Sequence, residues 1–222
     1  EAFEEAARIS FKKYQDKILS PHFVLHVKEL LEEKFGKEIL EKGGLQVFTT
    51  LDPVLQKTAE DTMSERITSY PDKYGATNAA LLTVDLDKGQ ILAMVGAADY
   101  FNEDIDGNVN MVFRKRQPGS SFKPIVYANA FMKGYSPATP IFDVETDFGN
   151  KYVPQNYDGT FHGLVSARRA LDNSYNIPAV KMAFLGGVDN VITLAKKMGV
   201  SDLLSSEQYG TSIGIGTGEA TL

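Results

Sequence analysis

The sequence predicts an α/β fold of the α+β type, in which an antiparallel sheet is flanked by helices and a small helical module comes first. The first observation is a hairpin signal: residues 79–86 and 90–96 are apolar runs separated by Asp87-Lys88-Gly89. The glycine supplies the positive φ that a tight turn needs, so the two runs are predicted to be adjacent antiparallel strands. The second observation is a set of helical patterns on both sides of this hairpin.

The first helical pattern covers residues 1–43, which are rich in charged side chains. Pro21 follows Leu19-Ser20 as a break, and Gly36 and Gly43-Gly44 interrupt the pattern again. Proline and glycine end helices, so this stretch predicts short helices and not one long helix.

The next segment predicts a strand followed by a capped helix. Residues 45–51 are rich in β-branched side chains, which favour a strand. Asp52-Pro53 predicts an N-cap with proline at the first helical position, and the helix is expected to run to about Thr68. We therefore expect a linker-like module over residues 1–75 and a second domain over residues 76–222.

Two apolar helices are predicted beyond the hairpin. Residues 120–133 carry a broad apolar face and are closed by Gly134, and residues 189–198 form an amphipathic pattern closed by Gly199. Residues 134–163 contain three prolines and predict an irregular segment at one rim of a cleft.

Composition excludes several functions. The chain has 222 residues, a net charge of −6 and interspersed basic and acidic residues, which argues against non-specific nucleic-acid binding. It has no cysteine, so disulfides and thiolate metal sites are excluded. The oxygen-bearing side chains of residues 104–110 lack the closing glutamate of a calcium loop, and His22 and His26 lack a third nearby ligand, so no metal site is predicted.

The strongest chemical signal is Ser120-Ser121-Phe122-Lys123, which Gly119 precedes and Pro124 follows. Proline is tolerated in the first helical turn, so the helix is predicted to begin around Ser120 or Ser121. Residues three apart on a helix are neighbours, so Ser120 Oγ and Lys123 Nζ are expected to project the same way. A serine activated by a lysine at the positive end of a helix suits an acyl-enzyme.

A second signal is Ser174-Tyr175-Asn176, where one apolar helical pattern ends and another begins. We expect a loop between two helices. Such a loop offers a hydroxyl to relay a proton and a carboxamide to hold a substrate amide.

In this order the two motifs resemble the first two active-site motifs of the penicillin-binding proteins and serine β-lactamases. The flanking strings Gln46-Val47-Phe48-Thr49-Thr50-Leu51-Asp52, Arg116-Gln117-Pro118-Gly119 and Ile177-Pro178-Ala179-Val180 are similar to class A, bifunctional penicillin-binding proteins. The likeness runs from about Pro21 onward. It implies the transpeptidase fold, with a hairpin that opens a central antiparallel sheet against which the nucleophile's helix packs.

The chain departs from the family in its third motif. Lys-Thr-Gly or Lys-Ser-Gly is absent, and the nearest string, Gly216-Thr217-Gly218, lacks the lysine. We expect that motif to lie downstream of a truncated transpeptidase domain, with a glycosyltransferase domain and a membrane anchor upstream. We also expect residues 1–222 alone to be nearly inert.

The resemblance implies a D,D-transpeptidase that cross-links peptidoglycan stem peptides ending in D-Ala-D-Ala. Ser120, Lys123 and Ser174 are the candidate catalytic residues; burial and nearby cationic groups are expected to lower the pKa of Lys123. Asn176 and Asn156 are the candidate substrate-binding residues, since Asn156-Tyr157-Asp158 resembles a family segment near the cleft. No cofactor or metal is implied. β-Lactams are expected as inhibitors, and the expected location is the outer face of the bacterial plasma membrane.

Three other functions use the same two motifs. A β-lactamase hydrolyses its acyl-enzyme rapidly, a sensor module is acylated without peptide turnover, and a D,D-carboxypeptidase passes the acyl group to water. The class A flanks favour the cross-linking reaction.

Overall fold

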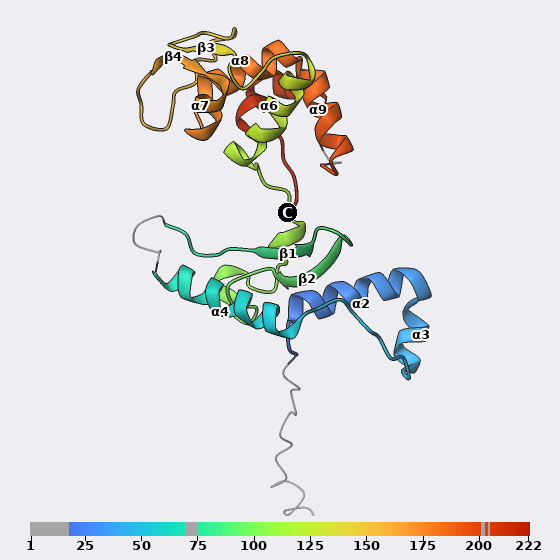
Figure 1. The fold of residues 1–222 in the computed structure, drawn as a ribbon. Coiled ribbons are helices and arrows are strands. Elements are labelled where there is room, and N and C mark those ends of the chain that lie inside the picture. The colour runs from blue at the N-terminus through green and yellow to red at the C-terminus, as the bar shows by residue number, and fades with distance from the viewer. Residues whose placement is uncertain (1–17, 70–74, 201–202, 204) are drawn as a thin grey trace, which may run out of the picture. The chain divides into compact units, whose positions relative to one another are not determined.

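The computed structural model describes residues 18–69, 75–200, 203 and 205–222 (Figure 1). By their contacts the residues form two compact units, Glu1–Val112 and Phe113–Leu222. The predicted boundary at residue 75 lies earlier, because the hairpin, which the sequence analysis gave to the second domain, packs with the N-terminal helices. Residues 1–17, which the sequence analysis included in a helical pattern, lie outside the described part.

The described N-terminal unit contains three helices and one hairpin, followed by short 3-10 turns. These are α2 (Pro21–Phe35), α3 (Lys37–Lys42), α4 (Pro53–Ser69), β1 (Leu81–Asp85), β2 (Gln90–Val95), η1 (Glu103–Ile105) and η2 (Met111–Phe113). The break between α2 and α3 falls at Gly36, whose φ of 82° is in the region that glycine adopts without strain. The predicted breaks at Pro21 and Gly36 are therefore confirmed.

The predicted cap of α4 is also confirmed. Asp52 Oδ1 accepts hydrogen bonds from the N–H groups of Val54 and Leu55, at 2.8 and 3.0 Å. The strand predicted over residues 45–51 is wrong, because these residues belong to no strand of the structure. Phe48 in the middle of this stretch is 91% exposed, so no sheet packs against these residues to hold them as a strand.

The hairpin prediction is confirmed. β1 and β2 pair antiparallel with Leu81 opposite Val95, an irregularity lies between Thr83 and Val84, and Gly89 has a φ of 65° in the turn. Alternate residues of β2 face different helices: Ala93 and Val95 pack with Ala59 and Met63 of α4, whereas Met94 packs with Phe23 of α2. His22 of α2 is buried as well, and its ring is hydrogen-bonded to Gly107 O and Gly96 N.

The C-terminal unit carries both chemical motifs. Its elements are η3 (Gly119–Phe122), α6 (Lys123–Met132), β3 (Pro140–Asp143), β4 (Gly163–Ser166), α7 (Ala167–Asp172), α8 (Asn176–Gly186), α9 (Val188–Lys197), α10 (Ser206–Tyr209) and η4 (Gly210–Ile215). The two predicted apolar helices are confirmed as α6 and α9.

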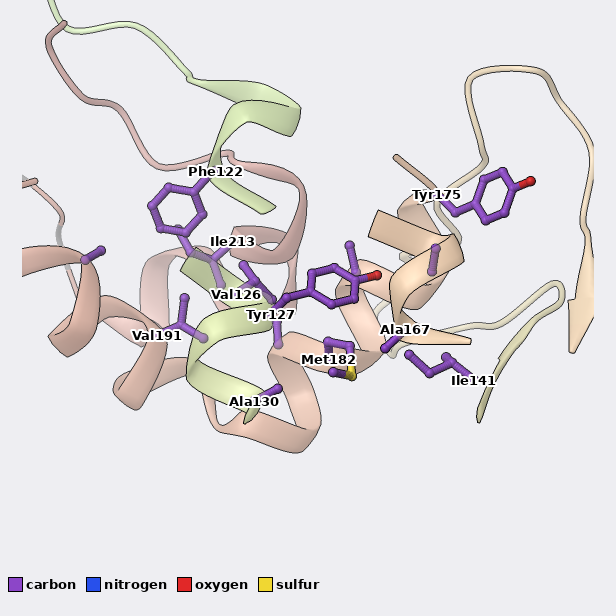
Figure 2. Close-up of a cluster of buried hydrophobic side chains, with 14 of the residues drawn as sticks. Phe122, Val126, Tyr127, Ala130, Ile141, Ala167, Tyr175, Met182, Val191 and Ile213 are labelled. Carbon is purple, nitrogen blue, oxygen red and sulfur yellow. The ribbon is translucent and has the colours of Figure 1, made fainter. Parts of the chain in front are cut away.

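The core of this unit lies around α6. Val126, Tyr127 and Ala130 of α6 cluster with Met182 of α8 and Val191 of α9, all of them nearly or fully buried (Figure 2). Burying a valine or methionine side chain of this cluster contributes about 1.5–3 kcal/mol to folding, so α6 is firmly packed. The packing of α6 on the hairpin sheet, which the resemblance implies, remains an expectation.

The segment expected to be irregular contains a strand. β3 pairs antiparallel with β4, placing Ile141 opposite Val165 and Asp143 opposite Gly163. Ile141 and Val165 point into the core, and Phe142 and Leu164 are exposed on the other face. The strand is only four residues long and begins with a proline, so its alternation gave too short a signal.

In the part of the chain that the structure describes, no single helix has the length and apolar character to cross a membrane, and only α8 with α9, bent by 91°, meet that requirement as a pair.

Candidate active site

The serine and lysine of the first motif lie at the start of α6. The chain enters through one 3-10 turn, η3, preceded by Pro118 and begun by Gly119, whose φ is 58°. The helix thus begins one to two residues before the predicted start, in 3-10 form. Ser120 is exposed, whereas Lys123 is only 1% exposed.

Lys123 Nζ links the two motifs. It lies 2.6 Å from the carbonyl oxygen of Ser174, 2.7 Å from Asn176 Oδ1 and 3.1 Å from Ser174 Oγ. These three atoms are its hydrogen-bond partners among the described residues, so the direct bond to Ser120 Oγ that the helical spacing allowed is not formed. The amine instead reaches the 174–176 loop.

Burial lowers the pKa of the Lys123 amine from 10.5 to about 8. The cause is loss of solvation of the charged form, and not the neighbouring cationic groups that the sequence analysis also invoked. Two of the partners, both carbonyl oxygens, only accept hydrogen bonds, whereas the Ser174 hydroxyl can also donate. These three oxygen atoms can therefore bind either a neutral amine, which has two N–H donors and one lone pair, or an ammonium group.

Ser174 lies in the predicted loop between two helices, α7 and α8, which confirms that part of the sequence analysis. Its φ of 56° places a non-glycine residue in the left-handed region, where L-residues are strained. Its N–H donates to Leu171 O at 3.0 Å, which closes the end of α7. This backbone turns both the carbonyl and the hydroxyl of Ser174 toward Lys123.

Asn176 is fixed on three sides. Its Oδ1 accepts from Lys123, its Nδ2 donates to the Gln155 carbonyl at 2.7 Å, and its backbone N–H donates to Asn156 Oδ1 at 2.7 Å. One hydrogen of its amide nitrogen is left for another acceptor.

Asn156 lies behind Asn176. It is 6% exposed, and its Nδ2 donates to Asp143 Oδ2 at 2.8 Å and to Thr160 O at 2.9 Å. Since its side-chain oxygen accepts from the Asn176 N–H, the oxygen and both N–H donors of its side-chain amide are engaged by protein atoms. The structure brings Ser174, Asn176, Lys123 and Asn156 into one network and places Asn156 in its interior.

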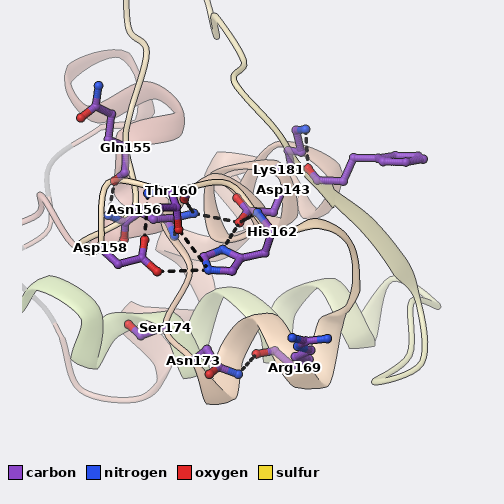
Figure 3. Close-up of polar contacts among 12 residues, drawn as sticks. Asp143, Gln155, Asn156, Asp158, Thr160, His162, Arg169, Asn173, Ser174 and Lys181 are labelled. Carbon is purple, nitrogen blue, oxygen red and sulfur yellow. Dashed lines mark hydrogen bonds and ion pairs between the residues drawn. The ribbon is translucent and has the colours of Figure 1, made fainter.

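Two residues of this network were missed by the sequence analysis. Asp143 is fully buried, and its Oδ2 accepts from the backbone N–H of His162 and from Asn156, and lies 2.8 Å from His162 Nδ1 (Figure 3). The other ring nitrogen of His162 lies 3.1 Å from Asp158 Oδ2. The imidazole stacks on Tyr175, with ring centroids 4.0 Å apart and planes 12° apart. The signal that was available is the aspartate that ends the alternating strand β3.

The string Gly216-Thr217-Gly218 lies beside the first motif but is not a strand. Gly216 caps η4 with a φ of 75°, and its carbonyl accepts from the Gly119 N–H at 3.2 Å. A Cβ at Gly216 would lie 2.0 Å from Gly119 O. Arg116 and Ala220 form a β-bridge further out. This segment supports the turn that carries Ser120.

The fold of this unit and its two linked motifs define the class of penicillin-binding proteins and serine β-lactamases. The chain belongs to the penicillin binding protein transpeptidase domain family, whose model matches residues 79–219. The matched region begins close to the predicted boundary at residue 75, earlier than the division by contacts.

Curated relatives agree with this assignment. The chain is 32% identical over 213 residues to penicillin-binding protein 2D of Bacillus subtilis, covering 92% of this chain and 29% of the relative. It is 34% identical over 188 residues to penicillin-binding protein 1B of Vibrio cholerae, covering 82% and 24%. The chain thus spans less than a third of the length of these relatives.

Solved structures show the same fold. Penicillin-binding protein 1A of Haemophilus influenzae superposes with a TM-score of 0.74 at 18% identity, over 99% of this chain and 47% of that one. PonA1 of Mycobacterium tuberculosis, in complex with penicillin V, gives a TM-score of 0.73 at 21% identity, over 91% and 56%.

Proposed function

We propose that this chain is part of a D,D-transpeptidase that cross-links peptidoglycan stem peptides through an acyl-enzyme on Ser120. The observation that carries the proposal is the buried amine of Lys123, which lies one turn after an exposed serine and is hydrogen-bonded to both functional residues of the 174–176 loop. A desolvated amine one helical turn from an accessible hydroxyl can serve as the base that activates that nucleophile.

In the first half-reaction Ser120 attacks the carbonyl of the penultimate D-alanine. The neutral Lys123 amine takes the hydroxyl proton, and its pKa of about 8 leaves part of the population neutral near pH 7. The helix start at Gly119 contributes a partial positive charge, and the Ser120 N–H is one donor to the developing oxyanion. A second donor is expected from a strand beyond these residues.

Ser174 and Asn176 serve the leaving group and the substrate. Ser174 Oγ, 3.1 Å from Lys123 Nζ, is placed to pass a proton from that amine to the departing D-alanine. The remaining amide hydrogen of Asn176 donates to a substrate carbonyl. An amine of a neighbouring stem peptide then attacks the ester and forms the cross-link.

The same geometry favours acylation by β-lactams, which present a reactive carbonyl to Ser120. PonA1 has been solved in complex with penicillin V, and penicillin-binding protein A of M. tuberculosis as acyl-enzyme complexes with imipenem and penicillin G. The names of the bacterial relatives support work on the cell wall, and we propose the outer face of the plasma membrane as its location.

The test is a product assay on the full-length parent protein with a D-Ala-D-Ala stem peptide and an acceptor amine. We expect release of D-alanine with formation of a cross-linked dimer, and neither product from Ser120→Ala. D-Alanine release without dimer would indicate a carboxypeptidase. Rapid hydrolysis of a chromogenic cephalosporin would indicate a β-lactamase, and acylation without peptide turnover would indicate a sensor.

A further inference from the structure

A continuous chain of hydrogen bonds runs from the lysine at the site to a carboxylate in the interior. Lys123 Nζ meets Asn176 Oδ1, the Asn176 N–H meets Asn156 Oδ1, and Asn156 Nδ2 meets Asp143 Oδ2, at 2.7, 2.7 and 2.8 Å. We propose that Asp143 and Asn156 are positioning residues that hold Asn176 and, through it, the Lys123 amine at the geometry that acylation requires. This inference rests on the proposed function.

The buried carboxylate is costly unless its hydrogen bonds are used. Asp143 is 0% exposed, and its Oδ1 has no hydrogen-bond partner among the described residues. An incompletely satisfied buried charge costs several kcal/mol, and the hydrogen bonds that Oδ2 accepts offset part of that cost. Oδ2 holds the Asn156 amide and the backbone and ring nitrogens of His162.

Both groups held by Oδ2 lead to the Ser174-Tyr175-Asn176 loop. Asn156 binds the backbone of Asn176, and the His162 ring stacks on Tyr175. The loop is therefore fixed at two consecutive residues, directly after the strained Ser174. A loop that carries a strained residue needs such contacts to keep it in place.

Asn156 has one orientation that serves both neighbours. Its oxygen faces an N–H donor, and its nitrogen faces two acceptors, Asp143 Oδ2 and Thr160 O. A carboxylate at this position would keep the acceptor for Asn176 but would place its second oxygen against those two oxygens. Asn156→Asp is therefore expected to remove the hydrogen bond from residue 156 to Asp143 Oδ2 and keep the one to the Asn176 N–H.

The experiment measures acylation of the full-length parent protein by a fluorescent penicillin, with the acylation rate constant resolved from the initial binding constant by stopped flow. We expect Asn156→Asp and Asn156→Leu to lower the acylation rate constant by roughly tenfold to a hundredfold, because misplacing a catalytic group by an ångström has effects of that size. The initial binding constant is expected to change less than about threefold, since the surface that meets the penicillin is retained. Asp143→Ala removes the oxygen that accepts from the Asn156 amide and is expected to lower the acylation rate constant by a similar factor.

The matched control is Asn129→Ala. Asn129 is another buried asparagine of the C-terminal unit, 4% exposed, and its amide donates to Gly186 O, away from the chain of bonds to Lys123. It is expected to lower the melting temperature as the Asn156 variants do, without slowing acylation. Equal slowing by Asn129→Ala, or wild-type rates in both Asn156 variants, would overturn the positioning role. No acylation of the wild type would instead overturn the proposed function, and the positioning role with it.

Discussion

Lys123 is the residue whose environment determines the chemistry of this site. Its amine is buried, it is surrounded by three oxygen atoms, and its pKa is lowered to about 8 by the loss of solvation. A lysine with the ordinary value of 10.5 would be almost fully charged at neutral pH and unable to accept a proton. By excluding water from the Lys123 amine, the fold keeps part of the population neutral and able to accept a proton.

Acylation is expected to depend on pH through this amine. The charged form is inactive as a base, so the rate of acylation should rise with pH in proportion to the neutral fraction, reach half its maximum at about pH 8 and level off above that. The lowered pKa also affects stability, because the folded state binds the Lys123 proton less tightly than the unfolded state does. The free energy of unfolding is therefore expected to increase as pH rises from about 8 toward 10.5. The measurement is the second-order acylation rate of the full-length parent by a penicillin from pH 6 to 10.

Lys123→Arg is the matched variant for that profile. Arginine keeps the positive charge but does not lose its proton in this range, so we expect a fall of at least about a hundredfold and no rise with pH. A wild-type rate that is flat across this range would contradict the role of Lys123 as the base.

Ser174 combines a chemical role with backbone strain, and two substitutions separate them. Ser174→Ala and Ser174→Gly both remove the hydroxyl that lies 3.1 Å from Lys123 Nζ, so both should slow acylation to a similar extent. Glycine adopts the φ of 56° without strain, so the glycine variant should be more stable than the alanine variant by about 1–2 kcal/mol. Chemical denaturation and acylation rates check the two halves, and acylation restored by glycine alone would show that the hydroxyl is dispensable.

At the scale of elements, the turn that carries Ser120 depends on a distant glycine. The segment after η4 passes so close to Gly119 that a side chain at Gly216 would meet the Gly119 carbonyl oxygen at 2.0 Å. Backbone cannot move aside as a flexible side chain can, so the first motif and this segment constrain each other.

Gly216→Ala is expected to destabilise the protein by roughly 2–4 kcal/mol, which adds the clash to the cost of a positive φ, and to slow acylation as the Gly119 turn shifts. Gly89→Ala is the matched control, because its φ is 65° and nothing lies within 4 Å of the added Cβ. It should cost only about 1 kcal/mol and leave acylation unchanged. Equal effects of the two variants in denaturation and acylation would contradict the close-packing account.

The elements that the sequence predicted well are those with local signals. The Asp52 cap, the turn at Gly89 and the apolar face of α6 each follow from a few neighbouring residues. The strand expected over residues 45–51 failed because β propensity has no effect without a partner strand, and β3 was missed because four residues give too little periodicity. Pairing between residues far apart in sequence carries no local signal.

At the scale of the whole molecule, the site could be predicted only in part. Ser120, Lys123, Ser174 and Asn176 stand in short motifs that the sequence displays, but their arrangement depends on Asp143 and His162, which stand 31 and 12 residues before Ser174 by the numbering. The buried position of Asn156 likewise follows from the packing of a loop between β3 and β4. A single sequence does not show which of its polar residues will be buried together.

Residues 1–222 contain no Lys-Thr-Gly or Lys-Ser-Gly string. In the family resemblance, the lysine of this string is expected to bind the substrate carboxylate, and its strand is expected to supply the second oxyanion donor. We therefore expect a fluorescent penicillin to label the isolated 222-residue chain at least about a hundredfold more slowly than the full-length parent. Time-resolved labelling on gels, with Ser120→Ala of the parent as the blank, checks this. Labelling at the parent's rate would show that the site within these residues is sufficient.

The proposed mechanism requires Ser120 to be the residue that becomes acylated. Peptide mass spectrometry of the penicillin-treated full-length parent tests it most directly, with Ser121→Ala as the matched control, because Ser121 is also exposed and its hydroxyl donates to Pro118 O. We expect one adduct, on Ser120, that persists in Ser121→Ala and disappears in Ser120→Ala. An adduct on any other residue, or one that survives in Ser120→Ala, would contradict it.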